Sequence, residues 1–327
     1  MPCVHLVFAT AVAALALGLT ASGAQAQGGY PNRPVKVLTG FPPGQASDTL
    51  GRYVVQKLQE SLGQPFQIDN RPGAAATIAT QAAAGAPADG YTLLLTTSGP
   101  MAVNPALYTK LPYDPVKDFA PVAGIATVPL LLVVNPSFPA TSLKEFVAVA
   151  RARPDTIDYA SSGIGVTNHL VTEMFSSAAG IHLNHIPYKG GPPGVADLVG
   201  GQVSVMFETT VAVLPLVRQG KLRALATSSS HRIAAAPDVP TVAELGYPGF
   251  DGVPWAAIMA PARTPPAIVA KLNAEINRIL RSKETREYFT AQGVEPMPMT
   301  PNELGRFVNA EIAKWTRAVK DSGAKAE

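Results

Sequence analysis

The sequence has little cysteine and little charge. Its single cysteine is Cys3, and Asp, Glu, Lys and Arg together make up 15% of the 327 residues, against roughly 25% in ordinary soluble proteins. One thiol near the start of the chain offers neither a disulfide nor a zinc-thiolate site. The net charge of +3 is too small and too dispersed for a nucleic-acid-binding surface.

Common catalytic motifs are also missing. The chain contains no G-x-S-x-G elbow, no P-loop, no H-E-x-x-H and no complete G-x-G-x-x-G, although residues 163–168 approach the last pattern without its third glycine. His182 and His185 form an H-x-x-H in a β-like run, where this spacing places the side chains on opposite faces. A packed or surface pair is therefore favoured over a metal site, and we expect neither a metal nor a cofactor.

The only long uncharged stretch lies at the N-terminus. Residues 6–19 form a 14-residue apolar run, followed by Ala24-Gln25-Ala26. This run is short for a membrane span, which needs about 20 residues, and the small residues are typical of a signal-peptidase site. Residues 1–5 lack Lys and Arg, which leaves an uncleaved anchor as the minor alternative. We predict a signal peptide at residues 1–26 and an exported protein without cysteine.

The rest of the chain alternates short β-rich runs with longer helical patterns. A strand is predicted at residues 35–38 and a helix at residues 48–62, where apolar residues recur every four positions. Further strands are expected at residues 66–68, 91–95, 130–134, 158–160, 183–186, 203–207, 222–227 and 255–259, and further helices at 76–84, 143–150, 168–179, 266–281 and 301–321. This alternation predicts an α/β fold with parallel sheets, arranged as two lobes.

Two strand-to-helix loops, residues 37–48 and 159–169, are rich in glycine and lack basic residues. A loop of this kind presents unpaired backbone N–H groups, supported by the helix dipole, to an anion such as a carboxylate. For each loop alone, a purely structural turn with a capping residue remains the alternative.

Several motifs in order along the chain carry a family resemblance. They are FPPG at 41–44 with Ser47-Asp48, NRPGA at 70–74, ADGYTL at 88–93, LPYDPVKDF at 111–119, the Ser-Gly loop with His169-Leu170, PYKGG at 187–191 and PDVPTVAE at 237–244. Together they resemble the Bug family, the periplasmic solute receptors of tripartite tricarboxylate transporters. The resemblance extends over residues 30–320.

This resemblance implies a type II periplasmic binding protein fold, in which two α/β lobes close on a small carboxylated molecule. We expect lobe 1 to contain residues 27–131 and 253–327, lobe 2 to contain residues 132–252, and residues 130–135 and 255–260 to be the crossover strands. The implied partners are membrane transporter subunits or a sensor kinase, with no nucleic acid, and the protein is expected to act as a monomer in the periplasm.

The resemblance also implies a ligand site built from both lobes. The loop at residues 42–48 should hold a carboxylate through backbone N–H groups, and residues 162–167 should hold the ligand from the opposite side. Gln45 stands where the family usually has glycine, and Val166 where it usually has threonine. The ligand-binding residues expected are Phe41, Pro42, Gly44, Gln45, Ala46, Asp48, Ser98, Ser162, Gly163, Gly165, Val166, Thr167, His169, Tyr188, Lys189 and Glu208.

Some of these residues have a structural alternative. Ser98 is equally suited to a turn, whereas for Tyr188 and Lys189 a structural role is favoured over lining the pocket, with Lys189 extending from a loop. His169 is favoured as a packed or capping residue rather than a catalytic base, because no nucleophile or paired carboxylate lies near it in sequence. Trp255 and Phe41 are expected to pack and to wall the cleft.

Two classes of function follow. A receptor that delivers a carboxylated solute to a transporter or sensor is favoured, because the expected site offers donors and shape but no nucleophile–base pair. The alternative is an exported two-lobe enzyme, a hydrolase or transferase, that acts on a small carboxylate. The sequence leaves the rest of the ligand open.

Overall fold

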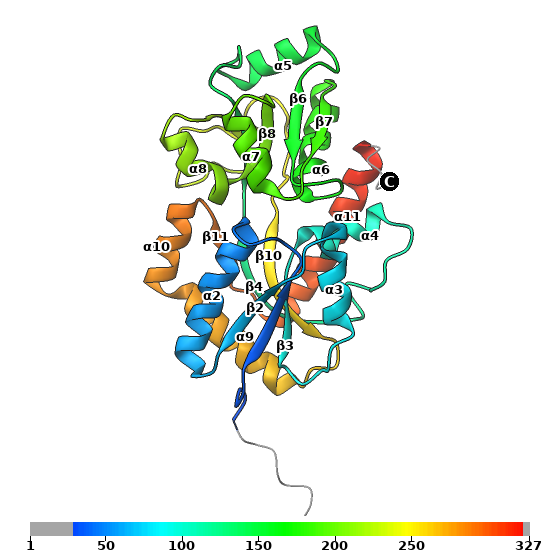
Figure 1. Ribbon diagram of the computed structural model, residues 1–327, viewed down its shortest axis with the longest axis vertical. Helices are drawn as coiled ribbons and strands as arrows, with labels where there is room; N and C mark the ends of the chain where they lie inside the picture. The colour runs from blue at the N-terminus through cyan, green and yellow to red at the C-terminus, as the bar shows by residue number, and fades with distance from the viewer. Residues whose placement is uncertain (1–28, 323–327) are drawn as a thin grey trace, which may run out of the picture.

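The computed structural model describes residues 29–322, which form two α/β lobes, one above the other in Figure 1. The predicted signal peptide lies outside the described residues. Within residues 29–322, no helix combines the length and the hydrophobicity needed to cross a membrane.

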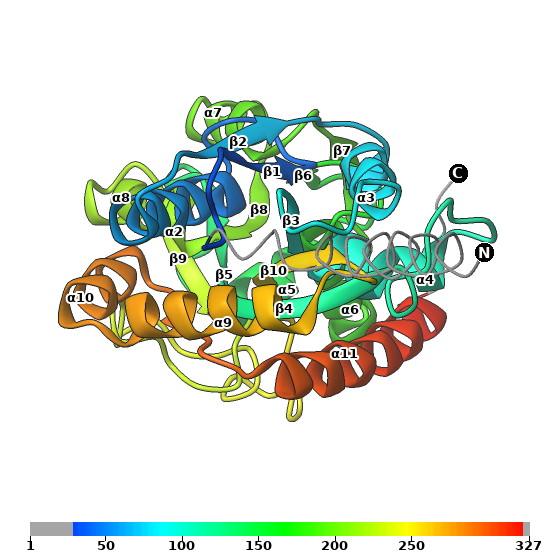
Figure 2. The ribbon, with the colours of Figure 1, turned by 90° about the horizontal axis from the view of Figure 1, so that it is seen from below.

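Lobe 1 is built on a six-stranded sheet with the order β11-β4-β10-β3-β1-β2. Its strands are β1 (Val35–Thr39), β2 (Phe66–Asn70), β3 (Thr92–Thr97), β4 (Phe119–Thr127), β10 (Trp255–Pro261) and β11 (Glu295–Pro296). One face packs on α2 (Ala46–Leu62), α9 (Pro266–Arg281) and α10 (Lys283–Gln292). The other packs on α3 (Thr77–Ala84), a π-helical turn (Gly99–Val103), α4 (Asn104–Leu107) and α11 (Pro301–Ser322). Seen from below, α9 and α11 both run alongside β4 (Figure 2).

Lobe 2 is built on a five-stranded sheet with the order β7-β6-β8-β5-β9. Its strands are β5 (Leu130–Val134), β6 (Asp158–Ser161), β7 (Asn184–Pro187), β8 (Val205–Thr209) and β9 (Arg223–Thr227). Helices α5 (Leu143–Ala152) and α6 (Thr167–Ala179) cover one face, and α7 (Gly191–Val199) and α8 (Thr210–Arg218) the other. All five residues of β5 are buried, because helices cover both faces, which explains its unbroken apolar sequence.

Both sheets contain parallel and antiparallel pairs, so the prediction of parallel sheets is confirmed only in part. Strands β1, β2 and β3 pair in parallel, as do β6, β7 and β8. In contrast, β10 runs antiparallel to β3 and β4, and β5 runs antiparallel to β8 and β9. Each of these two antiparallel strands enters its sheet directly from the other lobe, so no crossover helix returns the chain to the same edge.

The predicted crossover strands also need correction. Residues 130–134 form β5 within the sheet of lobe 2, and residues 255–261 form β10 within the sheet of lobe 1. The chain crosses between the lobes just before each strand, at residues 128–129 and 251–254, where Val128 N donates to Pro254 O at 2.8 Å. Leu130 and Leu131, expected in lobe 1, pair with β8 of lobe 2.

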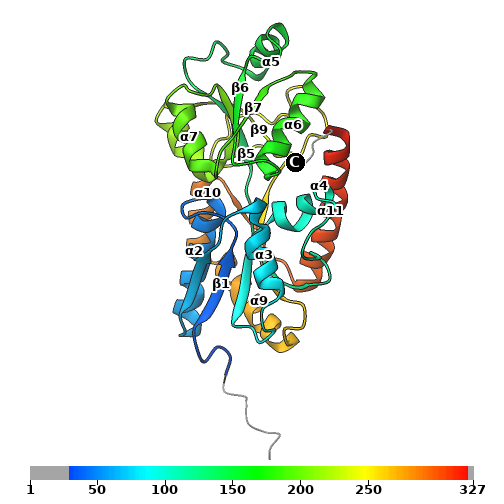
Figure 3. The same ribbon diagram turned by 45° about the vertical axis from the view of Figure 1, so that its right-hand side comes forward.

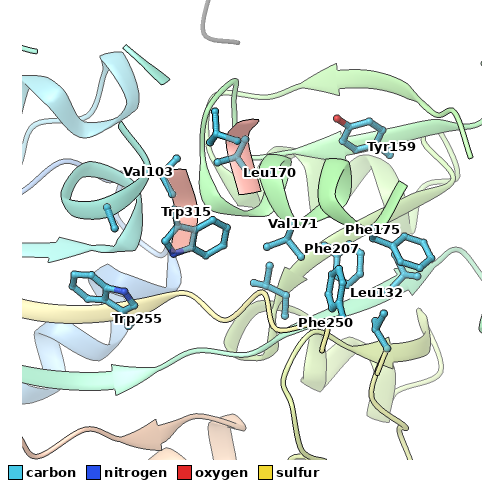
Figure 4. Close-up of a cluster of buried hydrophobic side chains, with 14 of the residues drawn as sticks. Val103, Leu132, Tyr159, Leu170, Val171, Phe175, Phe207, Phe250, Trp255 and Trp315 are labelled. Atoms are coloured by element: carbon cyan, nitrogen blue, oxygen red, sulfur yellow. The ribbon is translucent and has the colours of Figure 1, made fainter. Parts of the chain in front are cut away.

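An apolar cluster continues from one lobe into the other on the side of α11. Helix α11 belongs to lobe 1 but also packs against α6 of lobe 2 (Figure 3). Figure 4 shows Trp255 and Trp315 at the lobe 1 end of this cluster and Phe175, Phe207 and Phe250 farther into lobe 2. Both indole N–H groups donate to Glu311 Oε2, at 3.0 and 2.8 Å. The lobes are therefore joined on this side.

Candidate functional site

Two loops of almost identical backbone face each other between the lobes. Gly44 and Gly165 have left-handed φ values of 83° and 74°. The residues that follow them, Gln45 and Val166, are the N-caps of α2 and α6 and have nearly the same dihedral angles, −73° and 155° against −73° and 152°. Gln45 N and Val166 N each donate to the carbonyl oxygen three residues earlier, both at 3.4 Å.

The first turn of each helix is free to bind an anion. Neither the Gln45 side chain nor the Val166 side chain makes a capping hydrogen bond to its helix. The first backbone N–H groups of a helix have no partner within the helix. Residues 45–47 and 166–168 line one inner cavity of about 60 Å³ between the lobes. Because each helix also directs its positive dipole end there, the cavity suits a carboxylate.

The chain crossings and the strand ends complete this inner cavity. Val128, Leu130 and residues 254–256 form its wall at the connections between the lobes, together with Phe41. Thr97 ends β3, and Thr209 ends β8. Trp255 and Phe41 thus lie where the sequence placed them, as walls of the cleft.

An outer cleft of about 480 Å³ adjoins the inner cavity. The two spaces share Phe41, Gln45, Ser162 and Val166. The outer wall also includes residues 72–76 of lobe 1, in which Ala74, Ala75 and Ala76 all have positive φ values, 46°, 49° and 69°. Three successive left-handed alanines are costly, so the surrounding contacts must hold this turn, including the bond from Asn104 Nδ2 to Ala75 O.

Glu208 is the one ionisable side chain on the wall of the inner cavity. It is 3% exposed, and burial raises the pKa of its carboxyl, although hydrogen bonds from Thr209 and Ser162 offset part of the effect. Its Oε1 accepts from Thr209 N at 2.6 Å, and its Oε2 accepts from Ser162 at 3.3 Å and from Asn168 at 3.4 Å. A neutral carboxyl here would not repel a bound carboxylate.

The predicted site residues fall into three groups. The inner cavity is lined by Phe41, Gln45, Ala46, Ser162, Val166, Thr167 and Glu208, and the outer cleft adds Pro42, Gly163, Tyr188 and Lys189. Lys189 is exposed, and the hydroxyl of Tyr188 donates to Asp197 at 2.7 Å. Gly44, Asp48, Ser98, Gly165 and His169 line neither space, and their role in ligand binding stays a prediction.

Asp48 shapes its loop from behind. It is 2% exposed, and its carboxylate accepts from Gly44 N at 3.0 Å, Arg52 Nε at 2.8 Å and Asn70 Nδ2 at 2.8 Å. Burial alone would raise the pKa of Asp48, but these hydrogen bonds and the charge of Arg52 outweigh it and lower the pKa below its usual value. These hydrogen bonds show that Asp48 holds the turn in place.

His169 occupies the equivalent place in lobe 2. Its Nδ1 accepts from Gly165 N at 3.1 Å, and its ring stacks on His185 with centroids 4.2 Å apart. Burial lowers the pKa of His169 to about 4, so the imidazole is neutral at pH 7. This contact agrees with the structural alternative that the sequence favoured for His169.

Ser98 joins the lobes. Its hydroxyl, at the end of β3, is hydrogen-bonded to the Thr167 hydroxyl at 3.1 Å, and both side chains are buried. Because Thr167 is the first residue of α6, this bond connects the strand end of lobe 1 to the first turn of α6 in lobe 2.

A serine–histidine pair lies near the site. His185 Nε2 is 2.6 Å from Ser161 Oγ, a contact between residues 24 positions apart that the sequence did not reveal. Ser161 is fully buried, its hydroxyl also donates to Gly163 O, and neither residue lines the inner cavity or the outer cleft. The pair supports the loop at residues 161–165, and it lacks the access to substrate that a nucleophile needs.

Several lining residues were not predicted. Ser47 and Asn168 are the second residues of the two helices, and Thr97 neighbours Ser98 on β3. Their adjacency to predicted residues was the available signal. Thr209 likewise follows the predicted Glu208. Val128 and Pro254 had no such signal, because the chain crossings bring them to the cavity. Within residues 29–322, no group of three or more His, Cys, Asp or Glu side chains is placed to hold a metal ion.

The chain is similar to known receptors over most of its length. The model of the tripartite tricarboxylate transporter family receptor matches residues 50–324. Protein BugT of Bordetella pertussis is 45% identical over 297 residues, which cover 90% of this chain and 91% of BugT.

Solved structures agree with this fold. An R. palustris protein solved with adipate has a TM-score of 0.88 and 38% identity, covering 90% of this chain and 99% of the other. MatC from Rhodopseudomonas palustris, with bound malate, has a TM-score of 0.83 and 35% identity, covering 89% of this chain and all of MatC (100%). The two-lobe α/β architecture is therefore shared with solved proteins that contain small dicarboxylates.

Proposed function

The chain belongs to the Bug family of tripartite tricarboxylate transporter receptors, and on that premise we propose that it is a periplasmic receptor whose lobes close on a small carboxylated solute. The observation that carries this proposal is the pair of matching loops, which aim two uncapped helix N-termini into one cavity. Each turn supplies backbone N–H donors without a basic side chain, as suits a carboxylate.

The relatives support the same ligand class. The solved structures with adipate and malate contain ligands with carboxylates at both ends, and here the inner cavity and the outer cleft share four lining residues. One carboxylate would sit between the helix N-termini, and the rest of the solute would extend toward the outer cleft. The inner cavity itself has no basic side chain on its wall.

The receptor acts as an exported monomer that passes its solute to the membrane subunits of a transporter. N-terminal sequencing of the exported protein should find a start near Gln27, and light scattering should give the mass of one chain. An intact Met1 in the membrane fraction would contradict the export step.

Ligand binding should stabilise the fold. A ligand that binds only the folded state adds about 2.7 kcal/mol at a hundredfold excess over Kd. We expect at least one member of a panel of mono-, di- and tricarboxylates, amino acids and aromatic acids to raise the melting temperature. A response to uncharged sugars or metal ions alone would reject the proposal. Hydrolysis or transfer of a panel member would support the enzyme alternative.

A further inference from the structure

The side chain of Gln45 places an unsatisfied polar atom between the inner cavity and the outer cleft. Its Oε1 is buried and has no hydrogen-bond partner among the described residues. Gln45 lines both the inner cavity and the outer cleft. A buried carbonyl oxygen without a donor is unfavourable, typically by about 1–3 kcal/mol, so native structures rarely leave one unpaired.

The surroundings of Gln45 do not supply that donor. Gly190 of lobe 2 lies close by, since an added Cβ there would be 3.8 Å from Gln45 Oε1, but its N–H already donates to Ser162 O at 3.1 Å. In the same cavity, Ser162 and Asn168 already donate to Glu208. A donor carried by the ligand would therefore satisfy the amide oxygen.

The equivalent residue of lobe 2 has the opposite character. Val166 has the same N-cap conformation as Gln45 and lines the same two spaces, but its side chain is apolar. The two N-cap positions therefore differ in polarity, since the lobe 1 side chain offers a hydrogen-bond acceptor and the lobe 2 side chain offers none. Glu208 adds a second acceptor on the wall of the inner cavity, while no basic side chain lines that wall.

We propose that Gln45 selects carboxylates that also carry a hydrogen-bond donor, such as a hydroxyl, a carboxamide or an ammonium group. This inference rests on the proposed function, because it assumes that a carboxylate occupies the two helix N-termini. The carboxylate anchors the ligand, and the donor of the ligand bonds to Gln45 Oε1 at the border between the inner cavity and the outer cleft.

The test uses ligands that differ only in the donor. Calorimetry compares linear carboxylates of two to five methylenes that end in a methyl, a hydroxyl or an ammonium group. It also compares succinamate with its methyl ketone isostere, 4-oxopentanoate. We expect the donor-bearing member of a pair to bind about tenfold more tightly, the effect typical of one satisfied buried hydrogen bond. The hydroxyl and ammonium members separate a neutral donor from a charged one.

A variant connects this preference to the residue. Gln45→Met keeps the length of the side chain and the N-cap backbone, which makes no side-chain capping bond, but removes the amide. It should reduce the preference to less than twofold. Gln59→Met is the matched control, because Gln59 is exposed on the same helix, and it should leave the preference unchanged.

Three outcomes would overturn the inference. Carboxylates could bind with no preference for a donor, or Gln45→Met could leave a donor preference intact; in both cases the proposed function stands and only the role of Gln45 fails. If dicarboxylates bind in the wider panel but no donor-bearing ligand binds at any length, the inference is again rejected. If no carboxylate of any kind binds, the proposed function itself fails.

Discussion

The loop that starts α2 and the loop that starts α6 have the same backbone but are held by different side chains. In both loops, a glycine N–H donates to a side chain four residues later, at 3.0 Å to Asp48 and at 3.1 Å to His169. Asp48 is supported by Arg52 and Asn70, whereas His169 is supported by the stacked ring of His185.

This difference teaches which part of the loop carries the proposed function. Presenting backbone N–H groups to the cavity requires the left-handed glycine and the uncapped helix start, and both loops have them. The group that accepts from the glycine needs only to be an acceptor at the right place, so a carboxylate and a neutral imidazole both serve. The two loops should therefore differ in their response to pH, and a substitution at either glycine should depend on what lies beside it.

The largest difference is expected at the two glycines. Valine at either position is strained by the positive φ, but an added Cβ at Gly165 meets Leu107 Cδ1 of lobe 1 at 3.0 Å, whereas nothing lies within 4 Å at Gly44. Gly165→Val should therefore abolish ligand binding by holding the lobes apart, and Gly44→Val should mainly lower stability, by about 1–3 kcal/mol. Calorimetry and thermal unfolding separate the two effects; equal loss of affinity would refute the interlobe contact.

Removing one donor N–H should have the next largest effect. Ala46 is the first residue of α2, where proline is tolerated, and the extended conformation of Gln45 suits a residue before proline. Ala46→Pro should weaken carboxylate binding about ten- to a hundredfold, since a hydrogen bond to a charged group contributes roughly 1.5–3 kcal/mol.

The control for this variant is Lys283→Pro. Lys283 is the first residue of α10, after an N-cap with φ −64° and ψ 148°. It lines neither the inner cavity nor the outer cleft. This control should bind normally. If Ala46→Pro also binds normally, the N-terminus of α2 is not the carboxylate site.

Acid should loosen the loop of lobe 2 before that of lobe 1. The folded pKa of His169, about 4, lies below the ordinary value of 6.5, so its contribution to stability is complete above pH 6.5 and is lost as pH falls toward 4. Asp48 has a lowered pKa, so its contribution is kept until pH falls below 3.8. Hydrogen exchange, corrected for intrinsic rates, should show Gly165 losing protection first.

A substitution sharpens this comparison. His169→Asn keeps an acceptor for Gly165 N but does not titrate, so it should reduce the loss of protection between pH 6.5 and 4. Burial also lowers the pKa of His185 to about 4, and its titration accounts for the loss of protection that remains in this variant. Unchanged acid sensitivity in this variant would assign the effect to another group.

Glu208 should make the inner cavity respond to pH in the opposite direction. Because burial raises its folded pKa, wild-type stability should fall as pH rises from the ordinary value of 4.5 through the folded pKa. Glu208→Gln removes that charge, and its free energy of unfolding relative to wild type should increase over the same range. Chemical denaturation at a series of pH values measures this difference in the free energy of unfolding. A difference that does not change with pH would indicate that burial does not oppose the ionisation of Glu208.

The smallest effect is expected at the hydroxyl pair between the lobes. Thr167→Val removes one neutral hydrogen bond to Ser98, worth about 0.5–1.5 kcal/mol, and should weaken binding only severalfold. Ser98→Ala should act similarly, and the double variant should be less than additive if the bond forms on closure. Full additivity would show that the two hydroxyls act independently.

Only some of the residues that line the inner cavity could be predicted from the sequence. Ala46, Val166 and Thr167 were predicted from the strand–glycine–helix pattern, which is local, and they line the inner cavity. Asp48, Ser98 and His169 were also predicted, but they line neither the inner cavity nor the outer cleft. Which side of a loop faces a cavity depends on what packs behind it, and for these three residues the partners are 22, 69 and 16 positions away.

The sequence by itself determined the α/β alternation, the two glycine loops and the family, because hydrophobic periodicity and turn chemistry act over a few residues. The tertiary structure decided the antiparallel entry of β5 and β10, the joining of the lobes along α11, and the pairing of Ser161 with His185. It alone also left Gln45 Oε1 buried without a partner. These features depend on contacts between distant segments, whose free energies no local pattern contains.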